Sequence, residues 1–202
     1  MPKHVYLASQ SPRRLDLLQQ IGLTPTVLIL RGGAERMDVD ETPLPAEPAV
    51  DYVMRLARRK AWAGEFARCG RSLGDWPVVA ADTTVTLDGQ ILGKPSDAGE
   101  AQAMLRGYSG RSHSVLTGVA VAFRGRLAVA LSQSTVAFRH LSESEIATYV
   151  ASGEPFDKAG GYGIQGRAAL FIEHLSGSYS GVMGLPLFET AELLKEVGFS
   201  VI

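Results

Sequence analysis

The spacing of apolar and polar residues changes several times along the chain, and each spacing predicts a particular element. Runs that are apolar or β-branched without a helical period predict strands at 5–9, 78–87, 113–123, 127–138 and 168–175. A helical period places Val50, Val53 and Ala57 on one face and predicts a long helix over 49–64. Shorter helical patterns follow at 12–21, 96–107, 141–153 and 188–198.

Turn and cap signals fix the ends of several of these elements. The pair Asp88-Gly89 is a strong hairpin signal, so we expect 90–92 to return as a short strand. Ser142 and Glu145 have the spacing of a helical capping box. The segment 31–48 has no period and is rich in Gly, Pro and acids, which predicts a loop. Hairpins mixed with helices predict an α/β fold with a mixed, twisted sheet and flanking helices.

Composition narrows the class of protein. The chain has 202 residues, 46% of them apolar, which is enough for one sizeable core or two closely joined lobes, and we expect one domain over 1–202. Its 20 Lys and Arg nearly balance 21 Asp and Glu, so nothing favours a nucleic-acid partner. The single Cys69 excludes an internal disulfide and a thiolate zinc cluster. The sequence has neither a membrane-length apolar run nor a signal-peptide pattern, which predicts a cytoplasmic protein without a membrane partner.

Two arginines stand where a strand gives way to a helix. Ser11 can cap this helix, Pro12 suits its first position, and Arg13 and Arg14 then occupy its first turn. Free N–H groups and the helix dipole favour an anion there, so cations are mildly unfavourable for the helix alone. A bound phosphate chain would remove that conflict, because arginine adds bidentate donors to the same anion. The alternative is that both arginines are simply solvated.

Asp82 interrupts an apolar strand directly after Val78 to Ala81. An acid at such a point is either salt-bridged and structural or opens onto a site, and the neighbouring Thr83 favours a polar opening. Asp82 is therefore a candidate metal ligand or general base. Glu41 lies in the predicted loop and could join it, although loop acids are most often solvated.

Lys60 and Lys94 are two further candidate cations. Lys60 lies on the flank of the long helix, from which it either extends to water or reaches into a cleft beside the sheet. Lys94 follows the short return strand, where ideal pairing opposes it to Thr83 and puts it on the wrong face for Asp82. A bulge at Gly93 would bring Lys94 round.

The stretch EPFDKAGGYGIQG is the fourth candidate. Its glycines let the backbone approach a ligand closely, while Lys158 supplies a cation and Gln165 an amide that both donates and accepts. A sharp turn alone would also explain the glycines. The histidines are dispersed without ligand spacing, which argues against a histidine metal site. Cations and acids from several segments are together what a triphosphate with a divalent metal ion requires.

Seven of these segments resemble, in their sequence, motifs of the Maf (septum formation inhibitor) family of nucleoside triphosphate pyrophosphatases. They are LASQSPRR, DET, RLARRKA, AADTTV, LGKP, DKAGGYGIQG and LSGSYSGVMGLPL, and they span essentially the whole chain. The resemblance implies a fold like that of the inosine triphosphate pyrophosphatases, with two lobes around a cleft, and a homodimer. It also implies hydrolysis of a nucleoside triphosphate to monophosphate and pyrophosphate, with Mg²⁺ or Mn²⁺ as the divalent cation.

The resemblance also implies roles for individual residues. Those implied for catalysis are Asp82 as proton acceptor, Glu41, Lys60 and Lys94, with Glu41 and Asp82 as metal ligands. Those implied for substrate binding are Ser9, Arg13, Arg14, Thr83, Lys158 and Gln165. The stretch DKAGGYGIQG is similar to the branch that acts on dTTP and UTP rather than the branch that acts on 7-methyl-GTP. Gly161 is a departure, because that branch commonly has Ala there.

Two functions of other classes stay open at this point. A regulator of cell division could bind a nucleotide without hydrolysing it, although phosphate binding alone does not need Asp82. A different phosphohydrolase, such as a phosphomonoesterase, would release orthophosphate in place of pyrophosphate.

Overall fold

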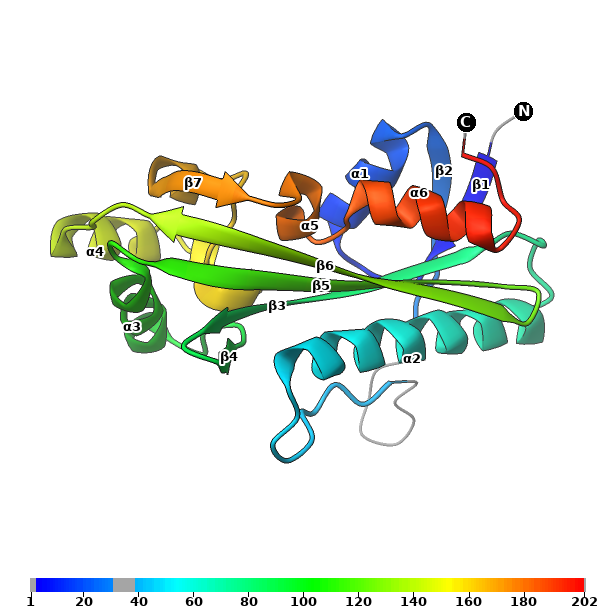
Figure 1. Cartoon of the computed structure of the whole chain (residues 1–202), viewed down its shortest axis with the longest axis horizontal. Coiled ribbons are helices and arrows are strands. Elements are labelled where there is room, and N and C mark those ends of the chain that lie inside the picture. Colours follow the sequence, from blue (N-terminus) through cyan, green and yellow to red (C-terminus); the bar gives the residue numbers. More distant parts are fainter. Residues whose placement is uncertain (1–2, 31–38, 202) are drawn as a thin grey trace.

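The computed structural model describes residues 3–30 and 39–201 and has one seven-stranded sheet at its centre (Figure 1). The strands run in the order β2-β1-β3-β5-β6-β7, with β4 paired to β3. β1 is parallel to β2 and β3, whereas the other pairs are antiparallel. Their bounds are β1 (Lys3–Leu7), β2 (Leu23–Val27), β3 (Val78–Leu87), β4 (Gln90–Leu92), β5 (Ser112–Phe123), β6 (Arg126–Phe138) and β7 (Ile172–Ser176). This sheet confirms the predicted α/β class.

Helices cover both faces of the sheet (Figure 1). α1 and α6 pack on one face, where Leu17 and Leu194 join the apolar side chains of β1, β3 and β5. α2 covers the other face through Ala57 and Ala61. The helices are α1 (Pro12–Gln20), α2 (Ala49–Gly70), α3 (Ala98–Tyr108), α4 (Glu143–Ala151), α5 (Tyr179–Met183) and α6 (Leu187–Glu196). No helix in the described part of the chain has the length and apolar character to cross a membrane.

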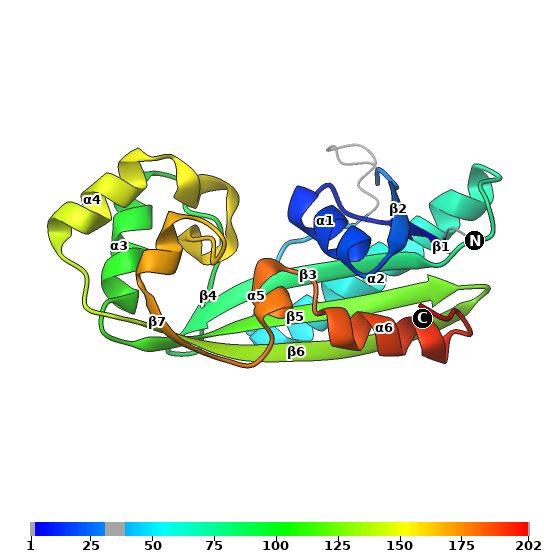
Figure 2. The ribbon, with the colours of Figure 1, turned by 90° about the horizontal axis from the view of Figure 1, so that it is seen from above.

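The long β5–β6 hairpin runs through two groups of elements (Figure 2). One lobe contains β1, β2, α1, α2 and α6. The other contains β4, α3, α4, β7 and short 3₁₀ turns at Glu154–Asp157, Ala159–Gly161 and Arg167–Leu170. This second lobe has its own core, which is rich in aromatic rings: Tyr108, Phe138, Tyr149, Tyr162 and Phe171. The two lobes are thus built around one continuous pair of strands.

α2 crosses the sheet at an unusually short distance. Gly118 of β5 lies beneath the helix, and a Cβ added there would lie 2.5 Å from the carbonyl oxygen of Val53. No side chain fits in that space without moving backbone. Gly118 is also the partner of Asp82 in the β3–β5 ladder. The glycine therefore lets α2 lie directly beside the strand position that carries the candidate acid.

β3 has an open edge in its middle. β1 pairs with it only at Val78 and Val79, and β4 only from Val85 to Leu87. Between these points the described strands leave β3 paired to β5 alone. Side chains alternate between faces along a strand, so Asp82 and Thr83 point to opposite faces of this open segment. A ligand at the open edge can reach both.

After residue 64 the sequence EFARCGRSLGDWP predicts a helix end followed by a surface loop, and α2 ends at Gly70. The structure departs from the predicted elements in three places. β2 was not predicted, because its sequence LTPTV is polar and carries a proline that only an edge strand tolerates. The strand predicted over 168–175 is wrong in its first half, where a 3₁₀ turn precedes β7. α5 lies in a predicted loop, and part of the predicted loop 31–48, residues 31–38, lies outside the described residues.

Candidate active site

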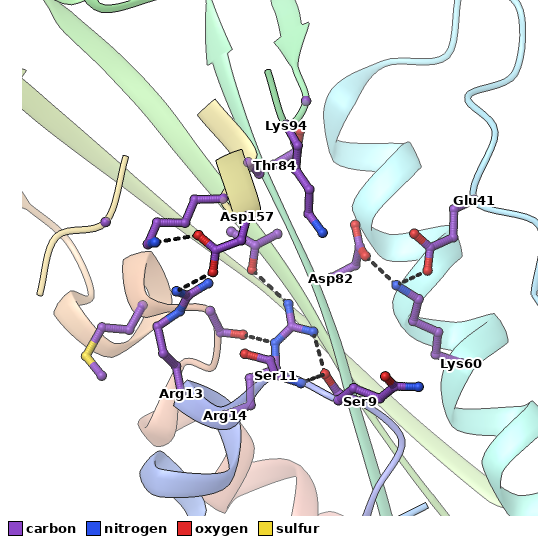
Figure 3. Close-up of a pocket in the computed structure, with 18 of the residues that line it drawn as sticks. Ser9, Ser11, Arg13, Arg14, Glu41, Lys60, Asp82, Thr84, Lys94 and Asp157 are labelled. Atoms are coloured by element: carbon purple, nitrogen blue, oxygen red, sulfur yellow. Dashed lines mark hydrogen bonds and ion pairs between the residues drawn. The ribbon is translucent and has the colours of Figure 1, made fainter. Parts of the chain in front are cut away.

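A cavity of about 1350 Å³ opens between the two lobes along the free edge of β3 (Figure 3). That volume exceeds the roughly 300–1,000 Å³ of most small-molecule sites, so a nucleotide can enter it. The cavity brings together every residue singled out in the sequence: Ser9, Arg13, Arg14, Glu41, Lys60, Asp82, Thr83, Lys94, Lys158 and Gln165.

Lys60 joins the two candidate acids. Its Nζ lies 2.7 Å from Asp82 Oδ1 and 2.7 Å from Glu41 Oε1. Lys60 and Asp82 are largely buried, with side chains 13% and 12% exposed, whereas Glu41 is 61% exposed. The lysine on the flank of α2 therefore reaches into the cleft instead of extending to water. It holds the loop acid and the strand acid on either side of one positive charge (Figure 3).

The cations Arg13 and Lys158 face each other across the cavity through Asp157. Arg13 Nη1 lies 3.9 Å from Asp157 Oδ2, and Lys158 Nζ lies 2.5 Å from Asp157 Oδ1. Burial by itself would raise the pKa of Asp157, but the hydrogen bond and charge of Lys158, with the charge of Arg13, lower it. Asp157 is thus an anion between one cation from each lobe.

Arg14 behaves differently from Arg13, because its guanidinium is bonded to protein. Nε donates to the carbonyl of Gly184 at 2.7 Å, Nη1 to Ser9 Oγ at 3.1 Å and Nη2 to Thr83 Oγ1 at 3.2 Å. Burial lowers the pKa of Arg14, and the nearby charge of Asp82 opposes that change. Ser9 Oγ also accepts the N–H of Ser11 at 3.2 Å, which shapes the turn into α1. Arg14 therefore ties α1 to β3 and to the segment after α5.

Lys94 lies where the sequence could not place it. β4 ends at Leu92, so Gly93 and Lys94 lie outside the ladder and no bulge is needed to place Lys94. The chain leaves the sheet after Leu92, and Lys94 extends from the loop into the cavity (Figure 3). Because Lys94 lies outside the strand, the alternation of side chains between the two faces does not apply to it, and its side chain extends toward Asp82 (Figure 3).

The glycine-rich loop is anchored to the second lobe. Gly160 has φ +74°, and its N–H bonds to the carbonyl of Gly93 while its carbonyl accepts from Tyr108 Oη at 3.0 Å. A Cβ on Gly160 would lie 2.5 Å from the side chain of Val85, so no larger residue fits. His113 Nε2 lies 2.7 Å from Tyr162 Oη beneath the loop. Gln165, in contrast, is exposed at the cavity wall, and its amide bonds to none of the described residues.

The carboxylates suit a metal ion only in part. The described residues hold no cluster of three His, Cys, Asp or Glu side chains that would enclose a metal. Mg²⁺ does not need one, because proteins usually hold it by one or two carboxylates and the phosphates of the substrate complete its shell. Glu41 and Asp82, both within reach of a single cationic nitrogen, provide that donor set. The two carboxylates therefore fit a divalent cation in part, and its other ligands would have to come from a bound phosphate or from water.

Three contributors to the site were missed in the sequence. Asp157 was read only as part of a glycine-rich loop, although an acid directly before Lys158 was a visible signal. Gly184 accepts from Arg14, but a backbone carbonyl carries no sequence signal. Thr117 bonds to Thr83, and only the register of β3 and β5 shows that the two are opposite each other.

Comparisons with known proteins identify the family of the chain. Residues 4–197 match the family described as Maf-like protein. A dTTP/UTP pyrophosphatase of Nitrosomonas europaea is 55% identical over 198 residues, which cover 98% of this chain and 96% of that protein. Proteins of the same name from Aromatoleum aromaticum and Chromobacterium violaceum are 56% and 53% identical, covering 96% and 98% of this chain and 96% of each relative. The family match and these near-full-length relatives establish that the chain belongs to the Maf family.

Proposed function

We propose that the chain hydrolyses dTTP and UTP to the nucleoside monophosphate and pyrophosphate. The observation that carries this proposal is the cavity itself, in which the acids Glu41 and Asp82 lie beside cations from both lobes. A site for phosphate binding alone would need the cations without the paired acids. The names of the similar proteins, dTTP/UTP pyrophosphatase, support the same activity.

The proposed reaction uses Mg²⁺ or Mn²⁺, held by Glu41 and Asp82 together with phosphate oxygens. When bound, this ion supplies positive charge that polarises the phosphate oxygens. Arg13, Lys94 and Lys158 line the same cavity and stabilise the negative charge of the triphosphate. Before the substrate binds, the single negative charge of Asp157 lies between Arg13 and Lys158 and leaves one positive charge in excess for the phosphate chain.

Asp82 is the proposed proton acceptor. A water oxygen bonds to the α-phosphorus, and the bond from that phosphorus to the oxygen bridging to the β-phosphorus breaks. The proton of the water goes to a carboxylate oxygen of Asp82, and the electron pair leaves with pyrophosphate. Lys60 fixes the direction of the Asp82 carboxylate through its 2.7 Å hydrogen bond. This orientation is what a general base requires.

Gln165 is the proposed reader of the base. Its exposed amide can donate to a carbonyl and accept from the adjacent N–H on the edge of thymine or uracil. Guanine offers a compatible edge too, so the narrow approach of the glycine-rich loop must exclude the larger ring. A site that hydrogen-bonds one group discriminates strongly, because the wrong base leaves polar atoms unpaired.

A product assay over a panel of nucleotides tests the proposal. Wild-type protein with Mg²⁺ or Mn²⁺ is expected to release pyrophosphate from dTTP and UTP faster than from ATP, GTP or 7-methyl-GTP. Release of orthophosphate would indicate attack at the γ-phosphorus and a phosphomonoesterase. Binding without turnover would indicate a regulator, and 7-methyl-GTP as the best substrate would indicate the other branch of the family.

The variant Gln165→Ala tests base selection separately. We expect it to erode the preference for dTTP and UTP over GTP more than it weakens binding of the triphosphate, because the proposed contact of Gln165 is with the base. Competition between dTTP and GTP measures this directly. A variant that keeps the full preference would contradict the role of Gln165.

Two properties of the whole protein belong to the same proposal. The family resemblance supports a homodimer acting in the cytoplasm, with the chain forming one domain. Light scattering of the purified protein measures its mass, and a monomer at the working concentration would contradict the dimer.

A further inference from the structure

A chain of hydroxyl groups extends from Arg14 into the interior. Arg14 Nη2 donates to Thr83 Oγ1 at 3.2 Å, and the hydroxyls of Thr83 and Thr117 are 3.0 Å apart. Thr117 Oγ1 then donates to the carbonyl of Gly181, in α5, at 2.8 Å. Thr117 is only 1% exposed and does not line the cavity, so it has no contact with a ligand there.

In this series of hydrogen bonds, which we call the relay, the donor and the acceptor of each bond are determined. The one proton of the Thr117 hydroxyl goes to Gly181, so Thr117 can only accept from Thr83. Thr83 therefore gives its own proton to Thr117 and accepts from Arg14. Its remaining lone pair leaves Thr83 an acceptor, and not a donor, toward the cavity.

Two features of the fold bring the groups of the relay together: the register of β3 and β5, and the contact of Gly184 with Arg14. Thr83 and Thr117 are direct partners in the β3–β5 ladder, so their side chains lie together on one face. Gly184, with φ +119°, lies beside Arg14, and its carbonyl accepts from Arg14 Nε at 2.7 Å. The segment from α5 to Gly184 thus holds Arg14 twice, once through the carbonyl of Gly184 and once through Thr117 and Thr83.

We propose that Thr117 is a positioning residue that acts through Thr83 to fix the guanidinium of Arg14 for the triphosphate. Arg14 uses one N–H on each of its nitrogens for the described protein partners, which leaves one N–H on Nη1 and one on Nη2. The relay determines where those two donors point. The inference rests on the proposed function, because it assigns Arg14 to the phosphates of that substrate.

Tripolyphosphate, which has no base or sugar, is the probe that isolates this effect. Titration calorimetry in Mg²⁺ buffer is expected to show binding about tenfold weaker in Thr117→Val than in wild type, a size usual for coupled contacts. Thr190→Val is the matched control, because buried Thr190 also donates to a backbone carbonyl, that of Pro186 at 2.7 Å. It has no path to Arg14, so its binding stays at the wild-type level even if both variants melt at a lower temperature.

Two further variants separate positioning from stability. Thr117→Ser keeps the hydroxyl and is expected to restore binding. In the double variant with Arg14→Ala, Thr117→Val should cost nothing more, because the group it positions is gone. If Thr117→Val does not fold, Thr117→Ala removes the same hydroxyl without adding a methyl group and replaces it.

Three outcomes overturn the proposal: wild-type binding in the folded variant that interrupts the relay, failure of Thr117→Ser to restore it, or additive losses in the double variant. The proposed function fails in another way. Wild-type protein that binds tripolyphosphate but releases no pyrophosphate from dTTP or UTP would contradict that function and leave the relay intact.

Discussion

Asp82 and Lys60 form a buried ion pair beside the cavity, and this pair determines how the acid can be tested. Asp82→Asn keeps the shape and an oxygen acceptor for Lys60 Nζ but removes the charge and the basicity. We expect turnover of dTTP to fall by about 10²-fold or more, in the range of a lost general base. Pyrophosphate release measures it, with thermal melting as a check of folding. Near-normal turnover in a folded variant would contradict both roles of Asp82.

The adjacent arginines provide a matched pair of variants. Arg13→Ala removes only a 3.9 Å ion pair with the exposed Asp157, so we expect weaker triphosphate binding and an unchanged melting temperature. Arg14→Ala also removes three hydrogen bonds to Gly184, Ser9 and Thr83, so melting should fall as well as binding. Each lost charged hydrogen bond is worth roughly 1.5–3 kcal/mol of interaction. Equal melting of the two variants would show that the bonds of Arg14 do not stabilise the fold.

For single residues of the site, the sequence shows which types are present but not which residues they contact. Asp82 and Lys60 were visible because a charge stood among apolar residues. That Arg14 bonds to Gly184, 170 positions later, depends on how α5 packs on the sheet and leaves no local pattern. Both arginines looked equivalent in sequence, yet only Arg13 presents its charge mainly to the cavity.

Among the elements, the crossing of α2 over β5 sets the position of Lys60. Gly118→Ala would place a Cβ against the carbonyl of Val53, and α2 would have to move away from the sheet. We expect lower stability, in the range of about 1–3 kcal/mol for an overpacked site, and reduced turnover, because Lys60 moves away from Asp82. Urea unfolding and pyrophosphate release measure the two effects.

Gly70→Ala is the control for Gly118→Ala. Gly70 lies at the end of α2, has no positive φ, and leaves open space for an added Cβ. Gly125 has a φ of +76° and Gly93 lines the cavity, so neither is a suitable control. Gly70→Ala should leave both measurements near wild type. Gly118→Ala that also matches wild type would show that α2 tolerates the shift.

Long elements were predictable and short ones were not. β3 and the turn at Asp88-Gly89 have the predicted bounds, and Ser142 forms its capping box with Glu145. Such elements repeat their pattern or carry a cap. α5 has five residues, too few for a helical period to show, and β2 is an edge strand that buries little of its sequence. Both are held by tertiary contacts, which one sequence window does not contain.

For the molecule as a whole, the core of the second lobe predicts how stability depends on pH. Burial lowers the pKa of His113 from 6.5 to about 4, while its neighbours Tyr108 and Tyr162 have raised pKa values and stay neutral. Between about pH 6.5 and pH 4, His113 is therefore protonated in the unfolded chain but neutral in the folded chain. Stability from this group is complete above pH 6.5 and is lost as pH falls toward 4, by about 3 kcal/mol in all.

Urea unfolding between pH 7.5 and 4.5 measures this loss. His113→Gln, which does not titrate, should flatten the slope over that range. Glu47 and Glu145 do not interfere, because arginine partners lower their pKa values to about 2, and their stabilisation is lost only below the unfolded value of 4.5. The same slope in wild type and variant would mean that His113 is protonated without unfolding the lobe.

The opposite directions of Asp82 and Thr83 have a consequence for how this chain can change over generations. In the ladder Asp82 is opposite Gly118 and Thr83 is opposite Thr117. A shift of β3 by one residue would turn the threonine toward the face of Lys60 and the acid toward the face of Arg14. Insertions in the surface turns leave this frame unchanged. A single codon gained or lost within β3 would exchange the chemistry of its two faces, so we expect the site to tolerate changes of length in the turns but not inside this strand.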